Sequence, residues 1–360
     1  MLRCLELAAL GAGYVAPNPM VGAVLVNEDR IIGEGYHKMF GEAHAEVNCI
    51  ASVKDEDKHL IPQSSLYVSL EPCAHYGKTP PCADLIIQYK IPKVIVGCRD
   101  PFKLVDGKGI QKLQNADIQV AVNVLENECL GLNKRFFTYY EQHRPYIILK
   151  WAQTINNKIA GNESSRLYIT NDYTNRLVHR WRSEEAAILV GTKTAMLDNP
   201  ELNNRLWPGP SPIRLVIDMR LQLPLSLKIF DLHSRTIIFN AKKHEEKENG
   251  LLYYQVTEDV SLVHQVVNAL HQLKIQSVLV EGGARLLQSF IDEEMWDEAR
   301  IITNEEMRIK DGLSAPELNK VQKISSQKLF SDKIEFFKPQ TLSDRVTLVG
   351  KPGHPGGNKP

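Results

Sequence analysis

Residues 65–89 decide how the first half of the chain folds, and they read Ser-Leu-Tyr-Val-Ser-Leu-Glu-Pro-Cys-Ala-His-Tyr-Gly-Lys-Thr-Pro-Pro-Cys-Ala-Asp-Leu-Ile-Ile-Gln-Tyr. The apolar start of this stretch predicts a strand over 65–70. Its end predicts a helix over 81–89, entered through prolines. Between strand and helix lies a loop with two cysteines, Cys73 and Cys82. A strand that leads through a loop into a helix is typical of α/β layer structures.

The same alternation extends on both sides of this stretch. In the first half we expect helices and strands as follows: helix 2–10, strands 21–26 and 31–36, helix 44–53, strand 93–98 and one long helix over 126–140. In the second half we expect strands over 146–151, 187–191, 213–218, 236–240, 277–281, 334–338 and 346–350, with helices over 172–182, 260–273 and 284–291. Because a new α/β series begins near residue 143, we place two domains at 1–142 and 143–350. The Gly- and Pro-rich tail 351–360 is expected to be disordered.

The overall composition narrows the functional classes. The 360 residues include 43 Lys and Arg against 43 Asp and Glu, so the formal net charge is zero. Proteins that bind nucleic acid through phosphate contacts usually carry a basic excess, which disfavours that class. No apolar run approaches the roughly 20 residues that span a bilayer. Six cysteines are too few for a disulfide scaffold, and we expect a reducing, cytoplasmic setting.

Three short motifs predict a catalytic zinc site. His44, Cys73 and Cys82 offer one imidazole and two thiolates, which leaves a fourth tetrahedral position open for water. Zinc lowers the pKa of such a water and so supplies a nucleophile. Glu46 lies two residues beyond His44 and can shuttle protons without binding the metal. Zinc-dependent nucleobase deaminases combine these groups in this way, although their two cysteines are usually closer in sequence.

Two other interpretations of the same residues remain. Buried cysteines are often inert small hydrophobes, and a His-x-Glu pattern is common by chance. A structural zinc site normally shows a fourth Cys or His at ligand spacing. The remaining cysteines offer no such spacing, and we expect them to be core or near-surface thiols: Cys4, Cys49, Cys98 and Cys129.

The stretch from Glu71 to Cys82 resembles the bifunctional deaminase–reductases of riboflavin biosynthesis, in which the long insert between the cysteines is a hallmark. The resemblance extends to the segments 16–24, 35–37, 99–101 and 107–110. It implies a cytidine-deaminase-like α/β/α first domain that deaminates 2,5-diamino-6-ribosylamino-4(3H)-pyrimidinone 5′-phosphate. By position, the substrate contacts that it implies are Asn18, His37, His75 and Lys78. An amide can read the pyrimidine edge, and Lys and His can pair with the phosphate.

In the second half, a strand ends at Glu281 and the pair Gly282-Gly283 opens a helix. Glycines at such a junction let a phosphate approach the helix N-terminus, although they also serve as plain turn chemistry. The stretches 182–202 and 280–284 resemble the reductase half of the same family, which implies a dihydrofolate-reductase-like α/β domain that binds NADPH. The cofactor contacts that the resemblance implies are Ala152, Tyr168, Thr194, Asp198 and Gly283. The implied contacts to the phosphorylated substrate are Ser165, Arg182, Leu202, Arg205 and Glu281.

The resemblance therefore implies two consecutive reactions, a zinc-dependent deamination and an NADPH-dependent reduction of the ribosyl group to ribityl. We expect small phosphorylated pyrimidines as substrates, no nucleic-acid or membrane partner, and a homo-oligomer. A nucleic-acid base deaminase with a C-terminal binding module shares the zinc chemistry. It would favour a basic, aromatic-rich second half, whereas the chain is neutral and 7% aromatic. A zinc-stabilised binding protein without catalysis is a third possibility, but it would have no use for Glu46.

Overall fold

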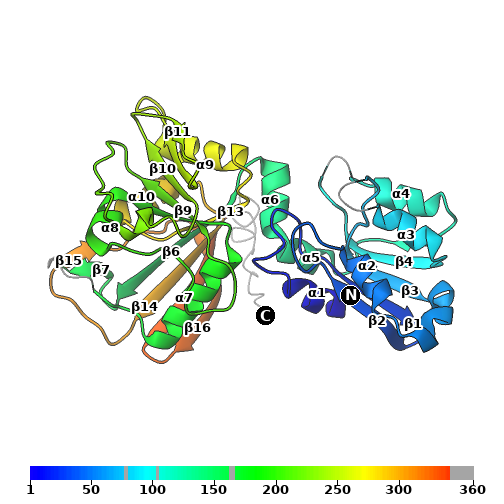
Figure 1. Ribbon diagram of the computed structural model, residues 1–360. Helices are drawn as coiled ribbons and strands as arrows, with labels where there is room; N and C mark the ends of the chain where they lie inside the picture. Colours follow the sequence, from blue (N-terminus) through cyan, green and yellow to red (C-terminus); the bar gives the residue numbers. More distant parts are fainter. Residues whose placement is uncertain (77–79, 103–104, 162–166, 341–360) are drawn as a thin grey trace, which may run out of the picture.

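The computed structural model describes residues 1–76, 80–102, 105–161 and 167–340. These residues form two lobes, one around each of two large sheets, and helix α6 lies between the lobes (Figure 1). We call the part from α1 to α6 the N-terminal lobe and the part from β6 to β17 the C-terminal lobe. None of the helices in the described residues is long and apolar enough to span a membrane.

The N-terminal lobe is built on a five-stranded sheet in the order β2-β1-β3-β4-β5. The strands are β1 (Gly22–Asn27), β2 (Arg30–Tyr36), β3 (Ser65–Leu70), β4 (Lys93–Cys98) and β5 (Gln119–Ala121). β1 is antiparallel to β2 and β3, whereas β3, β4 and β5 run parallel. Strands β3 and β4 are buried along most of their length, as expected of parallel strands covered on both faces.

Helices cover both faces of this sheet. They are α1 (Leu2–Ala9), α2 (Ala45–Ala51), α3 (Cys82–Gln88), α4 (Lys108–Gln114), α5 (Glu126–Leu132) and α6 (Lys134–Gln142), and a 3-10 helix covers Asp55–Gln63. Residues of α2, α3 and α4 share one hydrophobic core with β1, β3 and β4. Residues of α1 pack against the strands in a second cluster, and residues of α5 and α6 in a third. The four cysteines without an assigned role are all buried, as expected.

The expected single helix over 126–140 is wrong, because Asn133 divides it into α5 and α6. Asn133 leaves helical geometry, with φ −100° and ψ 22°. Its side chain bonds the backbone of Met20 twice: Oδ1 accepts from the Met20 N–H and Nδ2 donates to the Met20 carbonyl, both at 2.8 Å. The buried amide thereby satisfies its own polar atoms and those of a loop, which a continuous helix would not do.

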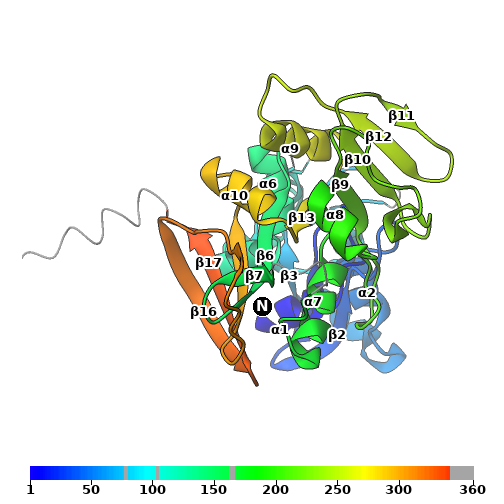
Figure 2. The same ribbon diagram turned by 90° about the vertical axis from the view of Figure 1, so that its left-hand side faces the viewer.

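The C-terminal lobe contains a ten-stranded sheet in the order β11-β12-β10-β9-β8-β13-β6-β14-β17-β16. Its strands are β6 (Tyr146–Thr154), β8 (Ala187–Gly191), β9 (Ile213–Ile217), β10 (Thr236–Asn240), β11 (Glu245–Glu246), β12 (Leu251–Gln255), β13 (Ser277–Val280), β14 (Glu298–Asn304), β16 (Val321–Leu329) and β17 (Asp332–Pro339). The strands from β12 to β14 are parallel, and β11, β16 and β17 pair antiparallel. β16 lies at the outer edge (Figure 2). A separate pair joins β7 (Lys158–Gly161) to β15 (Gly312–Ser314).

Helices also cover the sheet of the C-terminal lobe. They are α7 (Asp172–Glu184), α8 (Thr192–Asp198), α9 (Leu262–Gln272) and α10 (Ala284–Asp292), and a 3-10 helix covers Lys228–Phe230. α9 and α10 pack in the largest hydrophobic core, and α7 packs in another with β6 and β14. The expected strand 346–350 and the tail 351–360 lie outside the described residues.

Buried charges connect the two lobes. Arg135 of α6 donates from Nε to Glu185 at the end of α7 at 2.8 Å, and the Glu185 side chain is fully buried. Lys134 forms a second ion pair, with Glu298 of β14. Tyr139 adds a neutral link, because its hydroxyl donates to the His271 carbonyl at 2.9 Å. Breaking one partner of a buried pair leaves an uncompensated charge, so these contacts fix how the lobes dock.

Candidate functional site

The three expected metal ligands meet in the N-terminal lobe. His44 is the N-cap of α2, Cys82 is the first residue of α3, and Cys73 lies in the loop after β3. The ligand atoms of all three lie within 4.8 Å of one another. His44 Nδ1 is 3.6 Å from Cys73 Sγ and 3.3 Å from Cys82 Sγ. Tetrahedral zinc with ordinary bond lengths would separate such an N and S by about 3.6 Å, so the residues fit this metal.

The surroundings of the cluster favour a thiolate at Cys73. The pKa of its thiol is lowered by the Cys82 side chain and by His44. The backbone N–H of Cys82 also points at Cys73 Sγ, at 3.3 Å. The thiolate is the form of cysteine that binds metal, so these surroundings favour coordination by Cys73.

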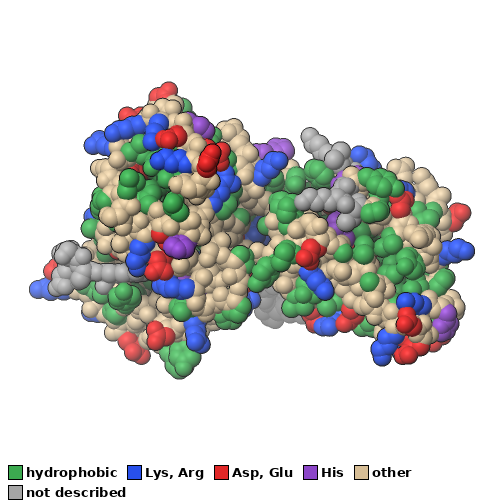
Figure 3. Space-filling view, in the orientation of Figure 1, with side chains coloured by type: hydrophobic (Ala, Val, Ile, Leu, Met, Phe, Trp, Pro, Cys, Tyr) green, Lys and Arg blue, Asp and Glu red, His purple; other side chains and the backbone are tan. Residues whose placement is uncertain are grey.

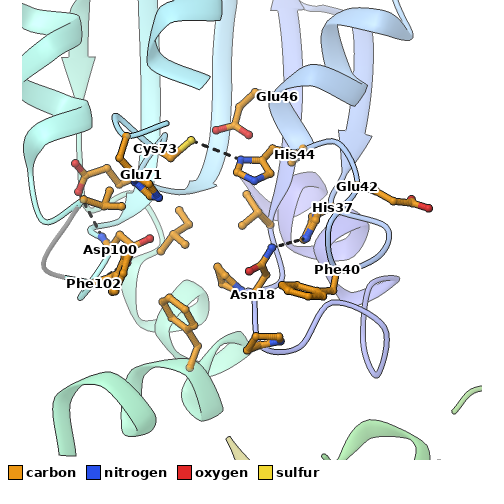
Figure 4. Close-up of a pocket in the computed structure, with 18 of the residues that line it drawn as sticks. Asn18, His37, Phe40, Glu42, His44, Glu46, Glu71, Cys73, Asp100 and Phe102 are labelled. Atoms are coloured by element: carbon orange, nitrogen blue, oxygen red, sulfur yellow. Dashed lines mark hydrogen bonds between the residues drawn. The ribbon is translucent and has the colours of Figure 1, made fainter. Parts of the chain in front are cut away.

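Glu46 lies beside the cluster in the first turn of α2, and its carboxyl group points towards His44 and Cys73 (Figure 4). Its side chain is buried. Burial raises the pKa of Glu46, and the negative Cys73 raises it further. A carboxyl group that holds a proton more readily than usual is better suited to return a proton that it has accepted.

A cavity of about 260 Å³ opens over the cluster. Three of the expected substrate contacts line it: Asn18, His37 and His75. The fourth, Lys78, lies outside the described residues. The cavity wall therefore brings together residues from the loop before β1, the end of β2 and the cysteine loop.

A chain of hydrogen bonds orients the Asn18 amide. Burial lowers the pKa of His37, which keeps its ring neutral. His37 Nδ1 lies 3.1 Å from the carbonyl of Ala43 and must donate to it, which leaves Nε2 as an acceptor. Nδ2 of Asn18 lies 3.1 Å from that Nε2 and donates to it (Figure 4). The oxygen of Asn18 is then the amide atom left for a ligand.

Two further polar groups line the cavity near the cysteine loop. His75 Nδ1 is buried and has no hydrogen-bond partner among the described residues. Asp100, which the sequence analysis did not single out, is also buried. Burial raises the pKa of Asp100 to about 7. An unpaired imidazole nitrogen and a carboxyl group near half-ionisation are both groups that a polar ligand can satisfy.

Glu71 is a second residue that the sequence analysis left without a role. Its buried carboxyl group accepts four backbone N–H groups: those of Gly107 and Gly109 at 3.0 Å, Ile110 at 3.3 Å and Asp100 at 3.4 Å. A Cβ on Gly109 would lie 1.9 Å from the carbonyl oxygen of Pro72, so the glycine permits this close approach. Glu71 thus anchors the loop after β4 to the segment that carries Cys73.

In the C-terminal lobe, Arg182 and Glu281 bind each other. Arg182 Nε donates to Glu281 Oε1 at 2.9 Å and Nη2 to Oε2 at 2.6 Å. Burial alone would raise the pKa of Glu281, but Arg182 and then Lys150 lower it to about 2. Arg182 Nη1 also lies 3.3 Å from the carbonyl of Asn203. Both expected contacts are therefore brought together, as a buried ion pair at the carboxyl end of β13.

Two other expected contacts follow α8. Arg205 is half exposed, and its Nη1 donates to Asn203 Oδ1 at 3.0 Å. The backbone N–H of Arg205 donates to Nδ1 of His179 at 3.1 Å. His179 was not predicted from the sequence. Burial, and then the charges of Arg182 and Arg205, lower the pKa of His179 to about 4, so the ring accepts this bond in its neutral form. The Leu202 side chain packs in a hydrophobic core, which leaves only its backbone for a ligand.

The expected cofactor contacts are partly assembled. Thr194 lies against the glycine pair: a Cβ on Gly282 would be 2.9 Å from Thr194 Cγ2, and one on Gly283 would be 3.4 Å from Thr194 Oγ1. Ala152 lies on β6 beyond the point where β13 ends, near the same edge of the sheet. The glycine pair precedes α10 at the carboxyl ends of parallel strands, a position that suits a dinucleotide phosphate.

Three expected contacts remain: Tyr168 and Asp198 for the cofactor, and Ser165 for the phosphorylated substrate. Tyr168 is 73% exposed before α7, and Asp198 ends α8. Ser165 lies outside the described residues.

Comparison with known proteins assigns a family model to each lobe. The cytidine and deoxycytidylate deaminase zinc-binding region matches residues 1–98, and the RibD C-terminal domain matches residues 145–304. Two similar proteins are riboflavin biosynthesis proteins RibD. That of Aquifex aeolicus (strain VF5) is 40% identical over 352 residues, covering 94% of this chain and 97% of its own. That of Actinobacillus pleuropneumoniae is 35% identical over 295 residues, covering 79% and 77%.

Solved structures agree with these matches. A diaminohydroxyphosphoribosylaminopyrimidine deaminase/5-amino-6-(5-phosphoribosylamino)uracil reductase from Thermotoga maritima is 35% identical and superimposes with a TM-score of 0.85, covering 94% of this chain and 97% of its own. Acinetobacter baumannii RibD, form 1, is 29% identical with a TM-score of 0.85, covering 94% and 98%. These matches confirm the α/β fold that the sequence analysis expected for both halves.

Proposed function

The chain belongs to the RibD family, the bifunctional deaminases and reductases of riboflavin biosynthesis, and we propose how its residues divide the two reactions. Residues 1–142 carry the deaminase and residues 143–350 the reductase. The observation that carries the deaminase assignment is the His44, Cys73 and Cys82 cluster, with Glu46 beside it at one wall of a cavity.

In the first reaction, water replaces the 2-amino group of the pyrimidinone phosphate and ammonia leaves. Zinc, when held by the three ligands, supplies a water of lowered pKa as the nucleophile. Glu46 takes a proton from the attacking water and returns protons to the ring nitrogen and the departing amino group. The raised pKa of Glu46 suits this exchange, because it makes the protonated carboxyl group easier to form as the water is deprotonated.

Recognition of the substrate falls to the other cavity residues. With its nitrogen donating to His37, Asn18 presents its oxygen to an N–H of the pyrimidine edge. His75 and Lys78 belong to the cysteine loop, and we assign them to the substrate phosphate. Among the described residues none bonds Nδ1 of His75, which supports this role, since a phosphate oxygen would satisfy that nitrogen.

In the second reaction the ribosyl group is reduced to ribityl. NADPH, when bound, supplies the hydride, and the task of the protein is to orient the cofactor and substrate and exclude water. We assign the cofactor to the following residues: Ala152, Tyr168, Thr194, Asp198 and Gly283. We assign the substrate to a second set of residues: Ser165, Arg182, Leu202, Arg205 and Glu281. Within this set Glu281 holds the Arg182 guanidinium in place, because a carboxylate directly against a phosphate would repel it.

A coupled assay tests both halves. Purified protein should release ammonia from the pyrimidinone phosphate, and the product should then drive NADPH oxidation. Glu46→Gln should abolish ammonia release while zinc stays bound, and it should leave reduction of separately supplied deaminated substrate intact. Arg182→Ala should do the reverse. Full ammonia release by Glu46→Gln, or loss of both reactions in Arg182→Ala, would contradict the assignments.

We also propose that the enzyme works in the cytoplasm as a homo-oligomer. None of the six cysteines, all of which lie in the described residues, forms a disulfide, which suits a reducing compartment.

The outer strand β16 is exposed along most of its nine residues, which suits pairing with a second copy of the chain. On the face drawn in Figure 3, basic and acidic side chains are interspersed, in keeping with the neutral net charge. Light scattering of the purified protein at several concentrations tests the oligomer, and a monomer throughout would exclude it.

A further inference from the structure

The loop from Pro17 to Met20, which carries Asn18, has a cavity on each side. One is the cavity over the metal ligands, and the other is a cavity of about 310 Å³ between the lobes. Asn18, Pro19 and Phe136 line both. A segment with open space on both sides gains little from close packing. Its position is therefore set by hydrogen bonds, those of Asn18 to His37 and Val15 and those at its two ends.

Two buried amide side chains make the hydrogen bonds at the two ends of the loop. Asn133 holds Met20 through both its N–H and its carbonyl, from within the N-terminal lobe. Gln276 comes from the C-terminal lobe, 259 residues further along the chain, and its Nε2 donates to the Pro17 carbonyl at 2.7 Å. Gln276 is 5% exposed, directly before β13. The residue next to Asn18 is thus held by the other lobe.

The position of Gln276 is itself well fixed. Its backbone carbonyl accepts the Tyr146 N–H at 2.9 Å, which ties it to β6. The next residue, Ser277, accepts the Ala186 N–H through its hydroxyl at 2.9 Å. The lobes are also docked nearby by the Arg135–Glu185 ion pair. Gln276 is therefore held in place by the C-terminal lobe, and its side chain contacts the loop of the N-terminal lobe that carries Asn18.

We propose that Gln276 is a positioning residue of the deaminase, contributed by the reductase lobe, which holds Pro17 so that Asn18 meets the substrate. This inference rests on the substrate role proposed for Asn18. It explains why a polar side chain at the amino end of β13, away from Glu281 at the carboxyl end, is buried between the lobes. It also means that the deaminase cavity is complete only when the two lobes are docked.

The test uses the full-length, zinc-loaded protein. Gln276→Leu removes the donor and keeps a side chain of similar size, and Gln276→Glu puts an acceptor opposite the Pro17 carbonyl. Loss of one hydrogen bond predicts a three- to tenfold lower kcat/KM for ammonia release, roughly the net effect of a single bond. Zinc content and the kcat/KM for reduction of deaminated substrate should stay within twofold of wild type.

The matched control is Tyr139→Phe, which removes another hydrogen bond between the lobes, at 2.9 Å, without touching the loop. It should leave ammonia release within twofold of wild type. An equal loss in Tyr139→Phe and Gln276→Leu would show that docking alone matters and would overturn the proposal. Parallel loss of both activities in Gln276→Leu would overturn it as well.

A double-variant comparison separates this inference from the proposed function. If Gln276 acts through Asn18, then Asn18→Ala combined with Gln276→Leu should be no slower than Asn18→Ala alone. Additive losses would overturn the inference and leave the role of Asn18 standing. An Asn18→Ala variant with full ammonia release would overturn both.

Discussion

Glu71→Gln should destabilise the N-terminal lobe far more than a carboxyl-to-amide change normally does. The two carboxyl oxygens of Glu71 each accept two backbone N–H groups, from Asp100 and Gly107 at Oε2 and from Gly109 and Ile110 at Oε1. Glutamine offers one oxygen, and its amide nitrogen would face two N–H groups. The loop beside the metal cluster would then lose two acceptors at once.

The magnitude follows from those two orphaned donors. A buried donor left without an acceptor costs about 1–3 kcal/mol, so the substitution should cost about 2–6 kcal/mol. For a lobe of this size, 1 kcal/mol lowers Tm by roughly 2–4 °C. We therefore expect a decrease of at least about 4 °C. Glu128→Gln, the same change on the exposed surface of α5, should stay within about 0.5 kcal/mol of wild type.

The chain offers separate signals for its two lobes. Its four tryptophans all lie in the C-terminal lobe, at positions 151, 181, 207 and 296. Tryptophan fluorescence during heating therefore follows that lobe, whereas zinc release, measured with a chromogenic chelator, follows the N-terminal lobe. In Glu71→Gln the zinc-release midpoint should fall and the fluorescence midpoint should hold. A fall in the zinc-release midpoint of less than about 2 °C, or an equal fall in both signals, would refute the reasoning.

Two further predictions concern pH. Burial raises the pKa of Asp100 from 3.8 to about 7, so the folded lobe keeps a proton that the unfolded chain releases, and its free energy of unfolding should fall as pH rises through this range. Asp100→Asn should flatten that fall in denaturant titrations at pH 5 and pH 8, and an unchanged slope would contradict it. Glu281 has a pKa lowered from 4.5 to about 2, so its ion pair stabilises the C-terminal lobe above pH 4.5 and is lost as pH falls towards 2. Glu281→Gln should lower the stability of the C-terminal lobe at pH 7, measured by tryptophan fluorescence, and its stability should fall less than that of wild type as the pH is lowered below 4.5. If the variant and the wild type were equally stable at pH 7 and below pH 4.5, the ion pair would have no stabilising role.

The metal cluster could be predicted from the sequence because zinc restricts its ligands to few residue types. One His and two Cys, with a Glu beside the His, form a pattern with little chemical ambiguity. The structure brings these residues together as expected. Strand β4 near the cluster and strand β13 in the C-terminal lobe were also predictable, since short continuous apolar runs are typical of buried parallel strands.

Strand β14 was not predicted, although it lies inside the second sheet. Its sequence, Glu-Ala-Arg-Ile-Ile-Thr-Asn, has charged residues at its first and third positions, Glu298 and Arg300, and they break the apolar pattern. Both are nevertheless buried, because Glu298 pairs with Lys134 of the other lobe and Arg300 donates to Glu298 at 2.6 Å. A buried charge is tolerable only next to its partner, and that partner lies more than 150 residues away in the chain. Periodicity within a short window carries no sign of it.

The same limit applies to the side chains that hold the sites in shape. Asn133, Glu71 and Gln276 all bind backbone atoms of loops rather than other side chains. Every residue except proline has the same backbone N–H and carbonyl groups, so the sequence does not show which residue is the partner of such a side chain. A metal site requires particular side chains on both sides of each contact, whereas these contacts require one polar side chain and a loop at the right place. Residues that perform chemistry can therefore be predicted from their types, and residues that position them emerge only once the chain is folded.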